Sequence, residues 1–297
     1  MRVFVTGATG FIGSAVVQEL IGAGHQVLGL ARSAESAKAL AAAGAQVHRG
    51  SLEDLDSLRA GAAAAGGVVH TAYIHDFSNI AASAGKDELA IDAIGDVLAG
   101  TGKPFVVTSA IGALTQGRVG TEHDAADPKS AGSHRVAAER AALALESRNV
   151  RVSLVRCPPT VHGAGDPNFV TALIRAAREK GVSAYIGEGL NRWSAVHRLD
   201  AAQVFRLALE KGAAGSVFHA VAEEGVPARE IADAIGRALA IPVVSKSPQE
   251  AIAHFGWIGR FFSCDMVASS ALTQERLGWK PRHAGLIADL TNGGYFS

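Results

Sequence analysis

The chain has 297 residues, of which 48% are hydrophobic and 19% charged, so it can bury a substantial core and is not of the disordered class. Lys plus Arg and Asp plus Glu number 28 each, which leaves no net field to recruit nucleic acid or an acidic membrane surface. There is no signal-peptide pattern and no apolar run near the ~20 residues that cross a bilayer. Two cysteines are too few for a disulfide framework. We therefore expect a cytoplasmic protein with a small-molecule partner, and neither nucleic acid nor membrane as a partner.

Short apolar runs alternate with helical patterns through the first half of the sequence, as strands and helices do in α/β proteins. The runs of strand length lie at residues 3–5, 26–30, 46–48, 67–70, 104–107 and 150–155. Alanine-rich stretches with charges at helical spacing separate them, for example at 35–43 and 136–146. Because the runs are continuously apolar, we expect strands buried on both faces. The pattern predicts an α/β fold of the Rossmann type, with a doubly wound parallel sheet.

The pattern changes after about residue 156. Helices are predicted at 168–180, 200–211 and 227–239, a strand at 216–220, and a loop with short strands at 185–196. We expect residues 1–156 to form a dinucleotide-binding domain and residues 157–297 mainly a smaller substrate-side lobe, with some segments returning to the first domain. Aromatic residues near the C-terminus, among them Trp257 and Phe261, suggest an apolar pocket, although aromatic residues are more often core.

A glycine-rich turn directly follows the first predicted strand and opens the first predicted helix. It reads TGATGFIG, with glycines at positions 7, 10 and 13. Glycine allows the tight turn and the close approach of a diphosphate, and the helix start offers it free N–H groups. The turn predicts cofactor contacts from Gly7, Thr9, Gly10, Phe11, Ile12 and Gly13.

The Gly-x-x-Gly-x-x-Gly spacing of this turn resembles the fingerprint of the extended short-chain dehydrogenase/reductase superfamily, which includes NAD(P)-dependent epimerases and dehydratases. The segments VVHTA, FVVTS, CPPTVHG and VHRLD, which begin at residues 68, 105, 157 and 196, are also similar to segments of that family. The resemblance implies the Rossmann fold and a nicotinamide cofactor. It further implies cofactor contacts from Ala72, Tyr73, Thr108, Pro158 and Val161.

The end of the second strand indicates which cofactor is preferred. An NAD site usually has Asp or Glu here for the ribose hydroxyls, whereas this chain has Ala31, Arg32 and Ser33. The guanidinium of Arg32 can bind a 2′-phosphate through charge-assisted hydrogen bonds, and Ser33 can add a further hydrogen bond. The sequence therefore favours NADP(H) over NAD(H). Alternatively, Arg32 is a solvated surface charge and the preference is mixed. After the third strand, Ser51 and Leu52 occupy the positions where the family contacts the adenine.

The resemblance also implies a catalytic Ser and a Tyr-x-x-x-Lys pair, and this sequence departs from both. With Glu139 aligned to the family's glutamate, Arg135 stands at the lysine position and Ala131 at the tyrosine position, while Ala110 stands at the serine position. Arg135 can hold the nicotinamide ribose or a phosphate, but it stays protonated and is a poor proton relay. The chain is therefore identified as an atypical member of the superfamily.

Other residues must then handle the proton. Tyr73 and His75 directly follow the fourth strand, at the edge of the sheet that faces ligands, and Ser109 lies one residue before the usual serine. We take Ser109, Tyr73 and His75 as candidate catalytic residues. The alternative for His75 is a polar loop residue without a role.

Three further residues are candidates for substrate contact: His134, His162 and Trp193. Alternatively, His134 is a solvated residue at the start of a helix, His162 is a loop histidine whose hydrogen bonds are made within the protein, and Trp193 packs in the core. A polar stretch with His123, Asp124 and Asp127 lacks fixed ligand geometry, so we expect no metal.

The sequence therefore predicts an NADP(H)-dependent oxidoreductase that acts on a small carbonyl or alcohol. One alternative is a non-catalytic NADP(H)-binding sensor or regulatory protein, and another is an epimerase, dehydratase or lyase that uses the cofactor transiently. A homodimer is also possible by analogy with the fold class.

Overall fold

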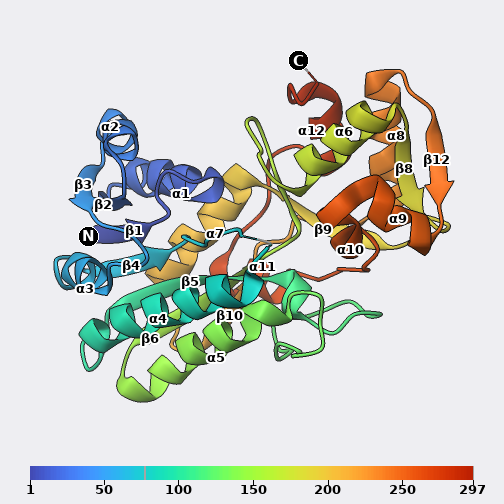
Figure 1. Ribbon diagram of the computed structural model, residues 1–297. Coiled ribbons are helices and arrows are strands. Elements are labelled where there is room, and N and C mark those ends of the chain that lie inside the picture. Colours follow the sequence, from blue (N-terminus) through green and yellow to red (C-terminus); the bar gives the residue numbers. More distant parts are fainter. Residues whose placement is uncertain (77, 297) are drawn as a thin grey trace.

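The computed structural model describes residues 1–76 and 78–296 and is built around a seven-stranded sheet (Figure 1). The strands run in the order β10-β6-β5-β4-β1-β2-β3, and every neighbouring pair is parallel. They are β1 (Arg2–Thr6), β2 (Gln26–Ala31), β3 (Gln46–Arg49), β4 (Gly67–His70), β5 (Pro104–Ala110), β6 (Arg151–Cys157) and β10 (Ser216–His219). The predicted Rossmann-type fold is confirmed.

Helices cover both faces of this sheet because alternate strand residues point to opposite sides. Val3 and Val5 pack in one buried cluster with α1 (Phe11–Gly22) and α7 (Arg198–Lys211). Phe4 packs in a second cluster, on the other face, with the remaining large helices. These are α3 (Leu55–Ala63), α4 (Ile80–Leu98) and α5 (Val136–Ala144). The shorter α2 (Ala34–Ala42) packs near β2 and β3, and α11 (Ala271–Leu277) packs on α7 and β10.

A smaller lobe follows the sheet and has a buried cluster of its own. Its strands form the sheets β11-β9-β7 and β12-β8, with bounds β7 (Thr160–His162), β8 (Ser183–Ile186), β9 (Arg192–His197), β11 (Glu223–Pro227) and β12 (Val243–Lys246). Its helices are α6 (Phe169–Lys180), α8 (Ala228–Leu239), α9 (Pro248–Phe255), α10 (Gly259–Phe262) and α12 (Leu286–Asn292). Short 3-10 turns lie at Ile111–Ala113, Ser133–Arg135, Leu145–Arg148 and Gly256–Ile258. Among the described residues, no helix has both the length and the apolar character needed to cross a membrane.

The six apolar runs predicted as strands are β1 to β6, and the predicted helices at 168–180, 200–211 and 227–239 are α6, α7 and α8. The predicted strand at 216–220 is β10. It pairs with β6, so this segment of the second half returns to the main sheet. The stretch at 185–196, predicted as a loop with short strands, contains the end of β8 and most of β9, and β9 pairs with both β7 and β11. Strands β7, β11 and β12 were not predicted, because each is only three to five residues long and gains its partners from distant parts of the chain.

Candidate active site

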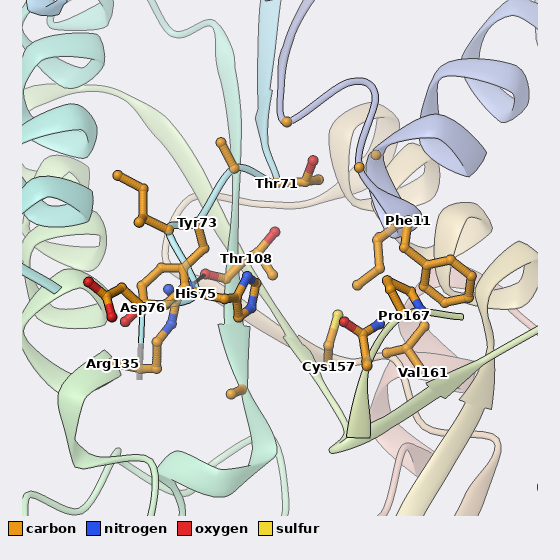
Figure 2. A pocket seen from close by; sticks show the side chains of 18 of the residues that line it. Phe11, Thr71, Tyr73, His75, Asp76, Thr108, Arg135, Cys157, Val161 and Pro167 are labelled. Atoms are coloured by element: carbon orange, nitrogen blue, oxygen red, sulfur yellow. Dashed lines mark hydrogen bonds between the residues drawn. The ribbon is translucent and has the colours of Figure 1, made fainter. Parts of the chain in front are cut away.

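A cavity of about 970 Å³ lies where the carboxyl ends of the central strands face the smaller lobe. In open α/β sheets this edge is where ligands bind. Figure 2 shows Tyr73 and Arg135 on one side of the cavity and Phe11, Val161 and Pro167 on the other. The cavity is therefore shared between the Rossmann sheet and the segment that leads into α6.

The glycine turn forms one wall of this cavity. Gly7 has a φ of +65°, and a Cβ added to it would lie 2.6 Å from the backbone nitrogen of Ala72. A Cβ on Gly13 would lie 2.0 Å from the carbonyl oxygen of Gly7. Gly10 caps α1 without a side chain, and the first turn of the helix holds no acidic residue. The free N–H groups and the positive end of the helix dipole therefore remain available to a diphosphate, and this cradle fits a dinucleotide.

The far end of the cavity lies beside β2 and β3. Arg32 is exposed and lines the cavity, together with Ser51 and Leu52. Ser33 does not line it: its hydroxyl oxygen accepts a hydrogen bond from the backbone of Ser36 at 3.1 Å and caps α2. The Ser33 hydroxyl is thus engaged in the helix cap, and a hydrogen bond from it to a cofactor stays a prediction. Ser36 lines the cavity instead.

All the other predicted cofactor residues line the cavity. They are Gly7, Thr9, Gly10, Phe11, Ile12, Gly13, Arg32, Ser51, Leu52, Ala72, Tyr73, Thr108, Arg135, Pro158 and Val161. Their contacts with a cofactor stay a prediction.

Tyr73 lies at the centre of a polar cluster on the cavity wall. Its ring centroid lies 4.3 Å from the guanidinium carbon of Arg135, 5.1 Å from the ring of His75 and 6.1 Å from the ring of His134. The four residues come from the segment after β4 and from the turn before α5. The structure thus brings a phenol, two imidazoles and a guanidinium to one place.

A buried chain of polar groups holds Arg135 beneath this cluster. Its guanidinium pairs with Asp87 at 3.1 Å and donates a hydrogen bond to the carbonyl oxygen of Thr108 at 2.6 Å. The other carboxylate oxygen of Asp87 lies 3.0 Å from Nε2 of His70, whose Nδ1 lies 2.8 Å from the hydroxyl of Thr6. Burial opposes the ionisation of Asp87, but Arg135 and His70 outweigh it and lower the pKa of this carboxyl. Its contacts with Asp87 and Thr108 thus fix the position of the Arg135 guanidinium.

The surroundings of the cluster favour the neutral forms of its titratable groups. Burial lowers the pKa of His134 to about 4, and the positive charge of Arg135 acts in the same direction. The pKa of His75 is lowered for the same two reasons. Burial raises the pKa of the Tyr73 phenol and outweighs the opposing charge of Arg135. At neutral pH the phenol and both imidazoles are therefore uncharged hydrogen-bond donors.

Ser109 lines the cavity, but its hydroxyl is already in use. It donates a hydrogen bond to Glu139 at 2.7 Å, and Glu139 forms a buried ion pair with Arg156. A hydroxyl has one proton, so Ser109 does not donate to a substrate oxygen while this bond is kept. This bond argues against Ser109 as a proton donor, and the roles of Tyr73 and His75 as polarising groups stay a prediction.

Two of the three predicted substrate residues lie outside the cavity wall. His162 is 0% exposed, and its Nδ1 lies 2.8 Å from a carboxylate oxygen of Asp289 in α12. Trp193 is 1% exposed and packs behind Phe169, with ring centroids 5.7 Å apart. Both expectations of direct substrate contact are corrected, because each residue lies on a strand whose neighbours bury it. His134 does line the cavity.

Other residues of the site, in the cavity wall or behind it, were missed by reasoning from the sequence. The Asp87 carboxylate was not singled out, although it lies on the buried face of α4 with Ile91 and Ile94, where an unpaired charge would be costly. Phe169 and Met266 also line the cavity, together with the previously noted Trp257 and Phe261. Nothing in the local pattern separates these apolar residues from ordinary core residues.

Comparisons with known proteins agree with this geometry. The chain matches the NAD dependent epimerase/dehydratase family over residues 3–221. It is 52% identical to an uncharacterized protein of Schizosaccharomyces pombe, over 100% of both chains. It is 29% identical to the decarboxylating sterol-4-alpha-carboxylate 3-dehydrogenase of Dictyostelium discoideum, over 77% of this chain and 74% of that protein.

The fold is also found in solved structures. MoeE5 in complex with UDP-glucose and NAD has a TM-score of 0.78 and 25% sequence identity, and the likeness covers 99% of this chain and 97% of that one. A glycine turn that fits a diphosphate and a family match over most of the sequence lead to the same conclusion: this chain belongs to the NAD dependent epimerase/dehydratase family.

Proposed function

We propose that this protein is an NADP(H)-dependent reductase of a small carbonyl compound, in which Tyr73 donates the proton to the carbonyl oxygen. One observation carries the proposal: the phenol of Tyr73, held against the guanidinium of Arg135, lines the same cavity as the glycine turn. A phenol beside a fixed cation is a suitable general acid, because the cation stabilises the phenolate that forms.

The preference for NADP(H) rests on Arg32. This side chain is exposed on the cavity wall just after β2, where a 2′-phosphate on the adenosine ribose would lie. Arg49 adds a second positive charge nearby, since it donates a hydrogen bond to the carbonyl oxygen of Ser33 at 2.6 Å. Glu53 also lines the cavity, but it pairs with Lys86 at 2.5 Å. When bound, the reduced cofactor supplies a hydride to the carbonyl carbon.

The proton that the carbonyl oxygen receives is supplied by side chains of the protein. Because the Tyr73 phenol is protonated at neutral pH, it can donate to the carbonyl oxygen as the alcohol forms, and water then returns a proton to the phenolate. His75 lies beside Tyr73, with ring centroids 5.1 Å apart, so it offers a path for that proton. Arg135 does not lose its own proton and acts by position and charge. The similarity to a dehydrogenase of Dictyostelium discoideum supports a redox step.

Two other functions have an observation in their favour. Alanine at positions 110 and 131, together with the engaged hydroxyl of Ser109, favours a non-catalytic NADP(H) sensor. The likeness to a structure that contains UDP-glucose and NAD favours an epimerase or dehydratase that uses its cofactor transiently.

A panel of aldehydes and ketones, incubated with NADPH and the protein, separates the three functions. We expect steady loss of NADPH absorbance with formation of one alcohol per NADPH consumed. Stoichiometric NADPH binding with no turnover of any carbonyl would favour the sensor. Formation of product from a sugar nucleotide without net change in the cofactor would favour the epimerase or dehydratase.

A further inference from the structure

Three aromatic side chains from the smaller lobe form a continuous surface in the cavity, here called the aromatic wall: Phe169, Trp257 and Phe261. The ring of Phe169 lies 5.5 Å from the ring of Trp257 and 5.5 Å from that of Phe261, and the last two lie 6.3 Å apart. Trp257 is 46% exposed, whereas Phe261 is buried at its base. These distances are those of edge and tilted aromatic packing, so the wall is a preformed apolar surface.

The core behind the wall holds it in place. Phe169 packs on the buried Trp193, and Trp193 packs on Phe262 with ring centroids 5.1 Å apart. Phe262 in turn packs on Phe255 at 5.2 Å. This stack continues into the interior of the lobe, so Phe169 is backed by closely packed core side chains.

The aromatic wall lies near the Tyr73 cluster. Phe169, Trp257 and Phe261 line the same cavity as Tyr73 and His134. A Cβ on Gly112 would lie 3.3 Å from the sulfur of Met266 and 3.9 Å from the backbone of Gly132, two residues before His134. Met266 lines the cavity beside the wall. One small molecule can therefore present its oxygen to Tyr73 and its body to the aromatic wall.

We propose that the substrate is an aryl aldehyde or aryl ketone whose flat ring packs on the aromatic wall while its carbonyl oxygen faces Tyr73. This inference rests on the proposed reductase function and names the class of its substrate. A ring gains apolar contact and favourable aromatic geometry on such a surface. A polyhydroxylated substrate would place hydroxyl groups against these aromatic faces, where only neighbouring polar residues such as Asn168 and Arg175 could replace its hydrogen bonds to water, so its binding is less favourable.

The test compares 2-naphthaldehyde with D-glyceraldehyde, which is a small polar aldehyde. Calorimetry on the protein saturated with NADP⁺ measures binding without turnover, because the oxidised cofactor holds no hydride to transfer. Tryptophan fluorescence gives a second measurement, since Trp193 and Trp279 are each 1% exposed and Trp257 is the accessible one of the three. We expect 2-naphthaldehyde to bind more tightly and to quench this fluorescence.

Variants show whether the wall is responsible. Trp257→Ala should weaken binding of 2-naphthaldehyde about tenfold, and Trp257→Phe, which keeps a ring, should restore most of it. Ile252→Ala removes a 70% exposed apolar side chain of α9 outside the cavity and is the matched control, with no change expected. D-glyceraldehyde binding should not respond to any of the three changes.

Equal or tighter binding of D-glyceraldehyde, or an unchanged affinity for 2-naphthaldehyde in Trp257→Ala, would overturn the substrate class. NADPH consumption with D-glyceraldehyde alone would also overturn it and leave the reductase function standing. Binding of 2-naphthaldehyde as expected, with no NADPH consumption, would support the aryl site and contradict the reductase function instead.

Discussion

The cavity has two halves that are built in different ways. The half beside the glycine turn is made largely of backbone, and its features follow from consecutive residues between β1 and α1. The half around Tyr73 is made of side chains from the segment after β4, the turn before α5, the start of α6 and α10. Backbone geometry tolerates few changes, whereas a side-chain site can be rebuilt from new positions. Under the proposed function, this difference explains how the chain keeps a turn that fits a dinucleotide while alanine stands at positions 110 and 131 and arginine at position 135.

Tyr73→Phe tests the half of the cavity around Tyr73, and we expect it to have the largest effect on activity of the variants considered. The variant keeps the ring over Arg135 and removes only the phenolic proton, so turnover of a carbonyl should fall about 10²- to 10⁴-fold. NADPH affinity should stay within about twofold, since the glycine turn is untouched. Steady-state kinetics and a cofactor titration check both parts.

Tyr185→Phe is the control for this variant, because Tyr185 lies outside the cavity and packs on Arg229. Turnover by Tyr73→Phe at the wild-type rate would remove Tyr73 from the chemistry and leave His75 as the proton donor to test.

Gly13→Ala tests the half of the cavity that is formed by the glycine turn. The added methyl group would lie 2.0 Å from the carbonyl oxygen of Gly7, so the turn must open, and we expect NADPH affinity to fall about 100-fold or more. Gly22→Ala lies in the same helix with no atom within 4 Å of the added carbon, and it should bind NADPH like the wild type. Calorimetric titration of the two variants measures the difference. Equal affinities would mean that the diphosphate does not lie at this turn.

The two halves also differed in how well the sequence predicted them. The glycine turn, the positions of β1 to β6 along the chain and the place of Arg32 on the cavity wall could be predicted, because each is a local pattern with a known physical cause. Asp87 and Phe169 could not be placed, because each reaches the site through packing between segments far apart in the chain. The prediction that Ser109 lies at the site agrees with its place in the cavity wall. Its hydrogen bond to Glu139 could not be predicted, because it depends on how α5 packs against β5.

His134 allows the side-chain half to be tested through pH. Burial lowers its pKa to about 4, so the folded protein binds this proton less readily than the unfolded chain, whose histidines titrate near pH 6.5. The contribution of neutral His134 to the free energy of unfolding is therefore fully present above about pH 6.5 and is lost as the pH falls toward 4.

Removal of this imidazole should therefore flatten the pH dependence of stability. Between pH 7 and pH 4, His134→Gln should lose less unfolding free energy than the wild type, by on the order of 1 kcal/mol because the ring is partly exposed. Urea unfolding at a series of pH values measures this, with His123→Gln as an exposed control that should follow the wild type. A His134→Gln curve parallel to that of the wild type would show that the ring is not desolvated.

The most direct test of the account is a calorimetric titration of the wild type and of Arg32→Ala with NADPH and with NADH. We predict that the wild type binds NADPH more tightly, and that Arg32→Ala loses about 10- to 100-fold in NADPH affinity while its NADH affinity is unchanged. An NADPH affinity that does not respond to Arg32→Ala, or the absence of binding heat with either cofactor, would contradict the account.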